Sequence, residues 1–194
     1  MKTRIIVDST VDLSAELKER LSIVPLTVHF GDEEYLDGVT IDHKTFYEKL
    51  IESDQLPTTS QATPDSFIKE FEKVKESGDS AVVITISSKL SGTYQSATIA
   101  AEDYENIYIV DSGSAAIGSG ILAERALELA DSGMEARDIA ETLNKEKEKT
   151  VIIALLDTLE YLKKADEFPK PSPLQVRCLI SNLLSLLKTE KLLF

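Results

Sequence analysis

The sequence has few of the residues on which several common kinds of site depend. Its 194 residues include a single cysteine, Cys178, which excludes an intramolecular disulfide and a cysteine-based structural zinc site. Basic residues are also in the minority, with 21 lysines and arginines against 34 acidic residues and a net charge of −13. Nucleic acids and anionic membrane surfaces need a clustered positive footprint, and the sequence contains no such cluster. We therefore expect neither as a partner.

Long apolar runs are missing as well. No window approaches the ~20 apolar residues that a membrane span requires, and the apolar run at residues 5–7 is too short for the hydrophobic region of a signal peptide. We expect a cytoplasmic protein without stable membrane insertion. The content of 42% hydrophobic and 28% charged residues is typical of a globular protein that buries a core.

Short apolar runs alternate with stretches of helical periodicity along most of the chain. This alternation predicts an α/β fold with a mainly parallel sheet flanked by helices. In such sheets the ligand-binding loops lie at the carboxyl ends of the strands. Strands are predicted at 3–7, 23–30, 81–86, 107–110 and 151–156, and helices at 14–21, 42–51, 64–77, 93–102, 113–130 and 135–149.

Two segments rich in hydroxyl side chains are the most informative feature of the chain. Residues 57–61 read Pro-Thr-Thr-Ser-Gln and residues 87–93 read Ser-Ser-Lys-Leu-Ser-Gly-Thr, and each is expected to lead into a helix. Unpaired N–H groups at a helix start favour an anion, and Ser and Thr hydroxyls add neutral donors beside them. Two such segments brought together would hold a carboxylate or a phosphate, whereas either one alone is also explained by helix capping.

Polar residues at the predicted strand ends extend this pattern. Asp-Ser-Thr at 8–10 follows the first strand, the segment 87–93 follows a central strand, and Asp-Ser-Gly at 111–113 follows the next. Because the carboxyl ends of parallel strands meet at one edge of a sheet, we expect these residues on a single rim.

Four motifs, in this order and spacing, together resemble the DegV family. They are Asp-Ser-Thr at 8–10, Pro-Thr-Thr-Ser-Gln at 57–61, Ser-Ser-Lys-Leu-Ser-Gly-Thr-Tyr-Gln-Ser-Ala at 87–97 and Val-Asp-Ser at 110–112. The resemblance covers residues 2–164 and implies a two-lobed α/β protein whose first lobe occupies residues 1–164. Proteins of this family look like fatty-acid carriers, and some act as the lipid-binding subunit of a bacterial fatty acid kinase.

The resemblance also implies a site. Thr59 and Ser91 would hydrogen-bond the carboxylate of a long-chain fatty acid, which is presented to a partner kinase for acyl-phosphate formation. Hydroxyl donors hold a carboxylate without an ion pair that must later be broken, and each buried methylene of the acyl chain adds ~0.8 kcal/mol. The chain is expected to be a lipid-binding protein rather than an enzyme, with the fatty acid as ligand and no cofactor or metal. Possible supporting residues are Ser60, Thr93, Asp8 and Ser112.

The chain departs from the family pattern after Lys164. Family members typically continue Gly-Gly-Arg-Ile-Ser-Lys-Thr, whereas residues 165–171 here read Ala-Asp-Glu-Phe-Pro-Lys-Pro. One codon choice for the family string, read one base later, encodes the residues seen here. Our hypothesis is that residues 165–194 are a frame-shifted tail and that the second lobe is truncated. The coding DNA at this point tests the hypothesis, since codons incompatible with the shifted string would refute it.

A second class of function shares the same hydroxyl segments. A non-catalytic sensor or scaffold that binds another small carboxylate or a phosphate ester needs no acyl tunnel. The dependence of affinity on acyl-chain length separates the two interpretations. The small residues at 113–120 allow either close approach of an acyl chain or tight helix packing, and both interpretations stay open.

Enzymatic alternatives have weaker support. A serine hydrolase would use Ser91, but no Gly-x-Ser-x-Gly elbow is present. His29 and His43 suit surface or capping positions better than catalysis, and two histidines give little support to metal ligation.

Two further motifs have simpler structural explanations. The lone Gly-Ser-Gly at 118–120 lacks a full nucleotide-binding fingerprint, and helix packing explains it better. Asp8 and Asp111 at strand ends are typical of turn caps. A metal role for them would be supported only if a chelator abolished activity.

Overall fold

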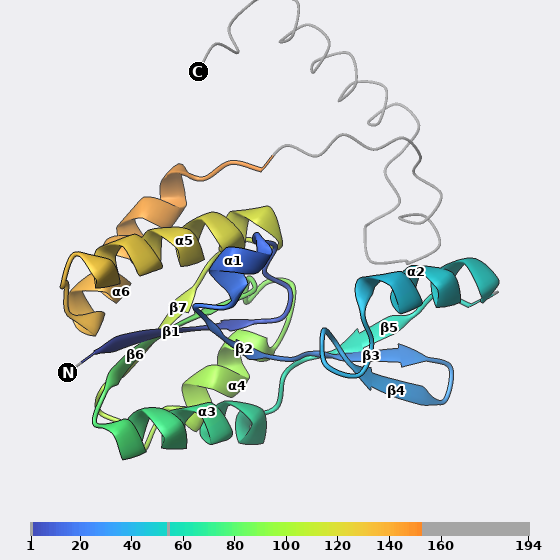
Figure 1. Cartoon of the computed structure of the whole chain (residues 1–194), viewed down its shortest axis with the longest axis horizontal. Helices are drawn as coiled ribbons and strands as arrows, with labels where there is room; N and C mark the ends of the chain where they lie inside the picture. Colours follow the sequence, from blue (N-terminus) through green and yellow to red (C-terminus); the bar gives the residue numbers. More distant parts are fainter. Residues whose placement is uncertain (1, 54, 153–194) are drawn as a thin grey trace, which may run out of the picture. The chain divides into compact units, whose positions relative to one another are not determined.

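A four-stranded parallel sheet organises the chain in our computed structural model, which describes residues 2–53 and 55–152 (Figure 1). The order of its strands is β2-β1-β6-β7, and every neighbouring pair is parallel. The predicted α/β fold with a mainly parallel sheet is therefore confirmed. The strands are β1 (Thr3–Asp8), β2 (Ser22–Val24), β6 (Ser80–Thr85) and β7 (Ile107–Asp111).

Helices cover both faces of this sheet, as Figure 1 shows. On one face lie α1 (Ala15–Lys18), α5 (Ile117–Asp131) and α6 (Ala136–Glu146), and on the other α3 (Pro64–Ser77) and α4 (Thr93–Ala100). All six residues of β6 are buried for this reason, as expected of a central parallel strand. The two resulting core layers contain Ile84, Val110, Leu127, Ile139 and Leu143 on one side and Ile6, Phe67, Phe71, Val83 and Ala97 on the other.

The ends of α3 lie where the helix at 64–77 was predicted and carry residues that commonly cap helices. The Thr63 side chain accepts a hydrogen bond from the Ser66 N–H at 3.3 Å, and Pro64 occupies the first turn. Gly78 ends the helix in the left-handed conformation, with φ of 66°.

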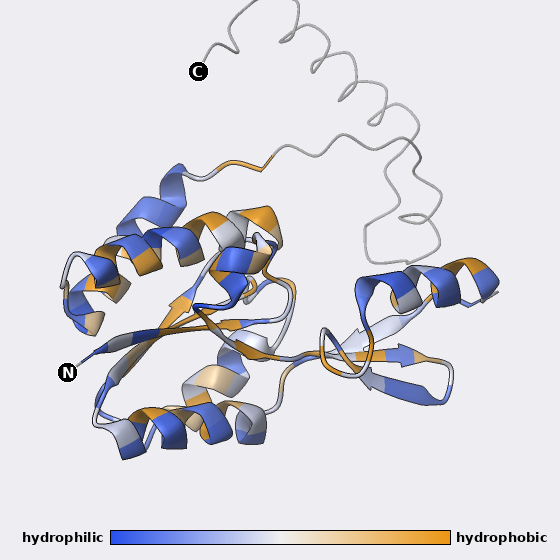
Figure 2. Ribbon diagram, viewed as in Figure 1, coloured by the Kyte–Doolittle hydropathy of each residue, from blue (hydrophilic) through white to orange (hydrophobic). Residues whose placement is uncertain are grey.

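A second, antiparallel sheet has the strand order β4-β3-β5 and is formed by β3 (Thr27–Phe30), β4 (Glu33–Leu36) and β5 (Thr58–Ser60). Helix α2 (His43–Glu52) packs against it, with the rings of Phe46 and Phe30 5.6 Å apart. Figure 2 draws β4 and β5 in blue or pale colours, in keeping with strands whose residues mostly face solvent.

The prediction of one strand over 23–30 was wrong, because the chain leaves the parallel sheet after Val24 and enters the antiparallel one at Thr27. Pro25 lies between them, and a proline has no N–H to continue a ladder. Residues 57–61 precede a helix as expected, but three of them form strand β5, which was not predicted. Helix α3 begins after the separate cap at Thr63.

Three other boundaries differ from prediction. The helix expected from residue 113 begins at Ile117, after a loop that ends at Ala116 with φ of 48°. The helix expected over 14–21 is only four residues long, and the helix expected over 135–149 ends in the 3-10 helix η1 (Lys147–Lys149). The strand predicted at 151–156 lies largely outside the described residues, as does the tail at 165–194.

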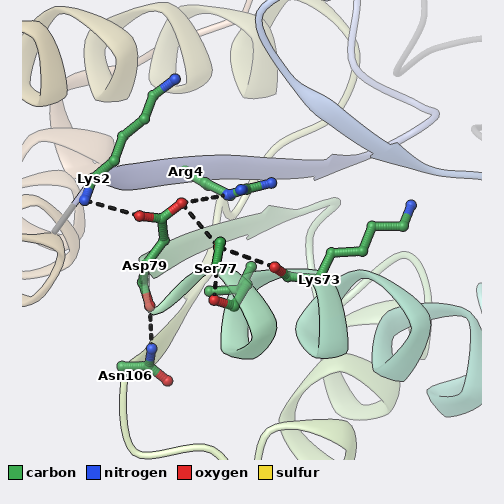
Figure 3. Close-up of polar contacts among 7 residues, drawn as sticks. Lys2, Arg4, Lys73, Ser77, Asp79 and Asn106 are labelled. Atoms are coloured by element: carbon green, nitrogen blue, oxygen red, sulfur yellow. Dashed lines mark hydrogen bonds and ion pairs between the residues drawn. The ribbon is translucent and has the colours of Figure 1, made fainter.

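Asp79 ties together three elements at the amino edge of the parallel sheet (Figure 3). Its carboxylate accepts hydrogen bonds from the Lys2 N–H at 3.1 Å and from Arg4 Nε at 2.9 Å, both at the start of β1. Ser77 Oγ, at the end of α3, donates to the same carboxylate, and Asn106 Nδ2 donates to the Asp79 carbonyl. These contacts lie at the opposite edge from the hydroxyl-rich strand ends. Within residues 2–53 and 55–152, no helix is long and apolar enough to cross a membrane.

Candidate functional site

Asp8 lies at the centre of the rim formed by the carboxyl ends of the parallel strands. Its side chain accepts hydrogen bonds from the Thr10 N–H at 3.0 Å, from the Thr10 hydroxyl at 2.5 Å and from the Ile86 N–H at 2.6 Å. The residue is 1% exposed, and this burial raises the pKa of the Asp8 carboxyl even though the three hydrogen bonds act in the opposite direction. Asp8 therefore joins the end of β1 to the end of β6.

Asp111 makes an equivalent connection between β7 and the hydroxyl segment at 87–93. It accepts hydrogen bonds from the Ser88 N–H at 3.1 Å, from the Ser88 hydroxyl at 2.5 Å and from the Gly113 N–H at 2.9 Å. Burial raises the pKa of Asp111, but the hydrogen bonds from Ser88 and Gly113 outweigh it and the pKa is lowered overall. Ser88 is thus held by Asp111, and its hydroxyl is committed to that carboxylate.

Ser112 is buried in the turn that follows β7. Its hydroxyl donates to the Ser114 carbonyl at 3.0 Å and accepts from the Ser119 hydroxyl at 3.1 Å. Ser114 in turn accepts a hydrogen bond from the Ser87 N–H at 2.8 Å through its carbonyl. The predicted rim is therefore present, because all three strand ends are joined by hydrogen bonds.

The small residues at the start of α5 pack closely against protein. A Cβ on Gly118 would lie 2.1 Å from Ser114 Oγ, and a Cβ on Gly120 would lie 2.2 Å from the Asp12 carbonyl oxygen. Of the two interpretations left open by the sequence, tight packing accounts for these glycines. The same contacts explain the Gly-Ser-Gly at 118–120 without a nucleotide.

Thr59 and Ser60 lie on β5, the edge strand of the antiparallel sheet. Thr59 is opposite Val28, and Ser60 is opposite Thr27. Successive side chains of a strand point to opposite faces, so these two hydroxyls face in opposite directions. Ser60 Oγ lies 2.8 Å from His29 Nε2. Thr59 is exposed, and its hydroxyl makes no hydrogen bond with the part of the chain that the structure describes.

The end of β5 meets the start of α4, which brings the two hydroxyl segments together. Gln61 Nε2 donates to Ser96 Oγ at 2.8 Å, and the Ala62 N–H donates to Thr93 Oγ1 at 3.3 Å. Thr93 Oγ1 also lies 2.9 Å from Ser91 Oγ. Ser91 is half-buried, whereas Thr93 is fully buried. Ser91 is therefore the more accessible of the two hydroxyls.

No hydrogen bond joins Thr59 directly to Ser91 among the described residues, so the junction runs through the residues beside them. Sequence reasoning did not single out Gln61 or Ser96, although both lie within the motifs quoted above. The sequence contained one signal for this contact, the glycine at position 92. Because Gly92 has no side chain, it leaves room for the Gln61 amide beside the start of α4.

The start of α4 places backbone and hydroxyl donors near Ser91. Its N-cap residue is Gly92, which makes no side-chain capping hydrogen bond, and its first turn contains no acidic residue. The Thr93 N–H donates to Ser91 Oγ at 3.3 Å. The arrangement at this helix start consists of amide and hydroxyl groups without a neutralising carboxylate, which suits a carboxylate or phosphate ligand.

Neither the cavity at the other edge of the sheet nor the carboxylates of the described residues forms an acyl-chain or metal site. A cavity of about 440 Å³ lies at the amino edge of the parallel sheet, and its wall includes the charged residues Lys2, Arg4, Arg20 and Asp131. Such walls do not suit an acyl chain, whose binding depends on apolar contact. In residues 2–53 and 55–152, no group of three or more His, Cys, Asp or Glu side chains is arranged to hold a metal ion.

Comparison with known proteins gives a consistent family. The model of the DegV family, described as an uncharacterised protein family, matches residues 2–166. A DegV domain-containing protein of Clostridium perfringens is 34% identical over 194 residues, covering 97% of this chain and 70% of that protein. One from Caldanaerobacter subterraneus is 36% identical over 165 residues, covering 83% of this chain and 59% of that protein.

Solved structures with the same fold include proteins that bind fatty acids. A fatty-acid-binding DegV family protein from Thermus thermophilus matches with a TM-score of 0.73 and 31% identity, over 86% of this chain and 60% of that one. A stearic acid-binding protein from Eubacterium ventriosum matches with a TM-score of 0.66 and 31% identity, over 74% of this chain and 52% of that one. The Fatty Acid Kinase B3 protein of Streptococcus pneumoniae, loaded with linoleic acid, matches with a TM-score of 0.65 and 26% identity. This match covers 76% of this chain and 55% of that one. The chain thus spans between half and two thirds of these solved relatives.

Proposed function

This chain belongs to the DegV family, and we propose that it binds a long-chain fatty acid whose carboxylate is held by Thr59 and Ser91. The observation that carries the proposal is the junction between β5 and α4. There the Gln61 and Ala62 contacts with Ser96 and Thr93 hold the two hydroxyl segments side by side.

The chemistry of the junction supports a carboxylate ligand. Thr59 has an exposed hydroxyl, and Ser91 is half-buried beside the uncapped start of α4. Neutral donors of this kind stabilise a carboxylate by charge-assisted hydrogen bonds and release it without breaking an ion pair. Thr93 supports Ser91 across the 2.9 Å contact between their hydroxyls.

The remaining residues named from the sequence have different positions. Asp8 and Ser112 are buried and hold the rim together, so their proposed contribution is to the shape of the site. Ser60 faces away from Thr59 and is paired with His29, which leaves it outside the proposed carboxylate contacts.

In this role the chain binds and presents the lipid, and a partner kinase transfers the phosphoryl group to the carboxylate. Two observations on relatives support this. The Thermus thermophilus and Eubacterium ventriosum proteins bind fatty acids, and the Streptococcus pneumoniae relative is the B3 protein of a fatty acid kinase. Formation of acyl phosphate and ADP from ATP and the fatty acid bound to this chain, on addition of a fatty acid kinase, tests the partner directly.

The binding proposal is tested by the affinity of the 194-residue chain for saturated acids of increasing length, measured by calorimetry. Each added methylene that is buried is expected to tighten binding by about 0.8 kcal/mol, or roughly fourfold. A flat dependence on length would instead support a sensor of small carboxylates. Absence of binding by every acid would reject both.

Matched variants test the head-group contacts. Thr59→Val and Ser91→Ala are each expected to weaken binding by about 1.5–3 kcal/mol, or roughly 10- to 150-fold, since each removes a hydrogen bond to a charged group. The control is Thr58→Val, which removes an equally exposed hydroxyl from the adjacent position on the opposite face of β5. Equal losses in Thr58→Val and Thr59→Val would contradict the assignment.

A further inference from the structure

Three polar side chains form a row across the antiparallel sheet. Ser60 on β5, His29 on β3 and Glu34 on β4 come from three neighbouring strands, and His29 is directly opposite Glu34. Their side chains occupy the face opposite the buried Val28 and Phe30. The row therefore lies on a solvent-facing surface rather than in the core.

One distance in this row matches a nucleophile and its base, and a carboxylate lies close to the other nitrogen of the base. His29 Nε2 lies 2.8 Å from Ser60 Oγ, within the range for proton transfer between a hydroxyl and a general base. The other ring nitrogen, Nδ1, lies 3.6 Å from Glu34 Oε1. A proton on Nδ1 facing Glu34 leaves the Nε2 lone pair directed at the Ser60 hydroxyl, which is the tautomer that a base requires.

The surroundings of Ser60 allow a reaction with an external molecule. Ser60 is exposed at the end of an edge strand, and the His29 side chain is 23% exposed. The N–H of Gln61, the next residue, donates no hydrogen bond to other described residues. In hydrolases with a serine nucleophile, the N–H that follows the nucleophile contributes to the oxyanion site.

We infer that Ser60 is a reactive serine, activated by His29 with the Glu34 carboxylate nearby, that takes an acyl group from small carboxylic esters. Ser60 Oγ attacks the carbonyl carbon while its proton passes to His29 Nε2. The alcohol leaves with that proton, and an acyl-serine remains. Water then attacks the acyl-serine, with His29 again accepting and returning the proton, and the products are one carboxylic acid and one alcohol.

This activity is separate from the proposed carboxylate contacts of Thr59 and Ser91. Thr59 faces the other side of β5, and Ser91 belongs to the segment that precedes α4. Reaction at Ser60 therefore does not depend on a bound fatty acid. Failure of one proposal leaves the other open to its own test.

The test is labelling of the ligand-free 194-residue chain with a fluorophosphonate, followed by peptide mass analysis. Attack by Ser60 on phosphorus displaces fluoride, and we expect a phosphonylated Ser60. Ser60→Ala should remove the label, and His29→Gln should slow labelling by about 100-fold or more, the usual effect of losing a general base. Glu34→Gln should have a smaller effect, because Glu34 is 72% exposed and its carboxylate is screened by water.

The control is Ser53→Ala, which removes an exposed serine that hydrogen-bonds only the Gln55 backbone among the described residues. Its labelling rate should equal that of the unaltered chain. Circular dichroism establishes that each variant is folded. Absence of label on Ser60, a label on another serine, or a rate unaffected by His29→Gln would overturn the inference. The rates of p-nitrophenyl acetate hydrolysis should fall in the same order among these variants. Such an order would show that Ser60 turns over an ester as well as reacting with the label.

Discussion

The Gln61 side-chain amide donates to Ser96 Oγ over 2.8 Å and so connects the end of β5 to the start of α4. The same side chain fills the space beside Gly92, where a Cβ would lie 1.9 Å from Gln61 Oε1. Gly92 itself has φ of −73°, a conformation open to any residue. A side chain at position 92 would therefore displace the Gln61 amide from Ser96, whereas the backbone conformation itself does not call for glycine.

Gly92→Ala is accordingly expected to destabilise the protein by about 0.5–1.5 kcal/mol, the usual net contribution of a hydrogen bond, because the Gln61 amide must leave Ser96. In a Gln61→Ala background the clash is gone. There, Gly92→Ala should be neutral or stabilise by up to ~1 kcal/mol, because alanine restricts the unfolded chain. Urea unfolding of the two single variants and the double variant measures this coupling. If the changes in unfolding free energy caused by Gly92→Ala and Gln61→Ala were additive, the side chains at positions 92 and 61 would not compete for the same space.

Elements with strong local signals could be predicted from the sequence. The buried strand β6, with six consecutive apolar or small residues, and α3, with Thr63, Pro64 and Gly78 at its ends, were predicted with little error. Strand ends that carry Asp8 and Asp111 were correctly expected on one rim. These features depend on propensity and on the geometry common to parallel sheets.

Features that depend on contacts between distant segments were not predictable. The segment at 57–61 contains no apolar alternation, and it forms a strand only because β3 provides a partner for it. The Gln61–Ser96 and Ser60–His29 hydrogen bonds join residues 35 and 31 positions apart, and local spacing contains no information on such pairs. Position 116 holds an alanine where a positive φ would favour glycine, so the loop before α5 was read as helix.

Thr85 provides a second test, at the end of β6. Its Oγ1 is buried and has no hydrogen-bond partner in the part of the chain that the structure describes. Thr85→Val removes this unpaired oxygen while keeping the shape, and is expected to stabilise the protein by about 1 kcal/mol. The control is Thr93→Val, which leaves the Ala62 N–H without its acceptor and should cost about 1–3 kcal/mol. Comparable destabilisation by both variants in urea unfolding would show that Thr85 has a partner.

Ala116 has a backbone conformation whose cost can be tested by a single substitution. With φ of 48° and ψ of −119° it occupies a region that glycine adopts easily and other residues adopt at a cost of about 1–3 kcal/mol. Ala116→Gly should therefore raise the free energy of unfolding by about 1 kcal/mol or more. Ala115→Gly is the control, and since Ala115 has no positive φ, it should lower that free energy. Stabilisation by both, or by neither, would contradict a strained residue at 116.

Asp79 predicts a dependence of stability on pH. Hydrogen bonds from Arg4, the Lys2 N–H and Ser77 lower the pKa of Asp79 from its ordinary value of 3.8 to about 2 (Figure 3). The folded state thus favours the ionised carboxylate. Its contribution to stability is fully present above the unfolded pKa and is lost as the pH falls from about 4 towards about 2.

The measurement is the thermal midpoint of the unaltered chain and of Asp79→Asn, compared from about pH 5 down to about pH 2. The gap between the two midpoints should narrow across this range, because the variant lacks the titrating group. Asp8, whose pKa is raised by burial, acts in the opposite direction but is present in both proteins and cancels in the difference. Asp32→Asn, in the exposed turn between β3 and β4, serves as the control for the removal of one carboxylate from the surface. A gap for Asp79→Asn that stays constant across this range would mean that the contacts of Asp79 with β1 contribute nothing to folding.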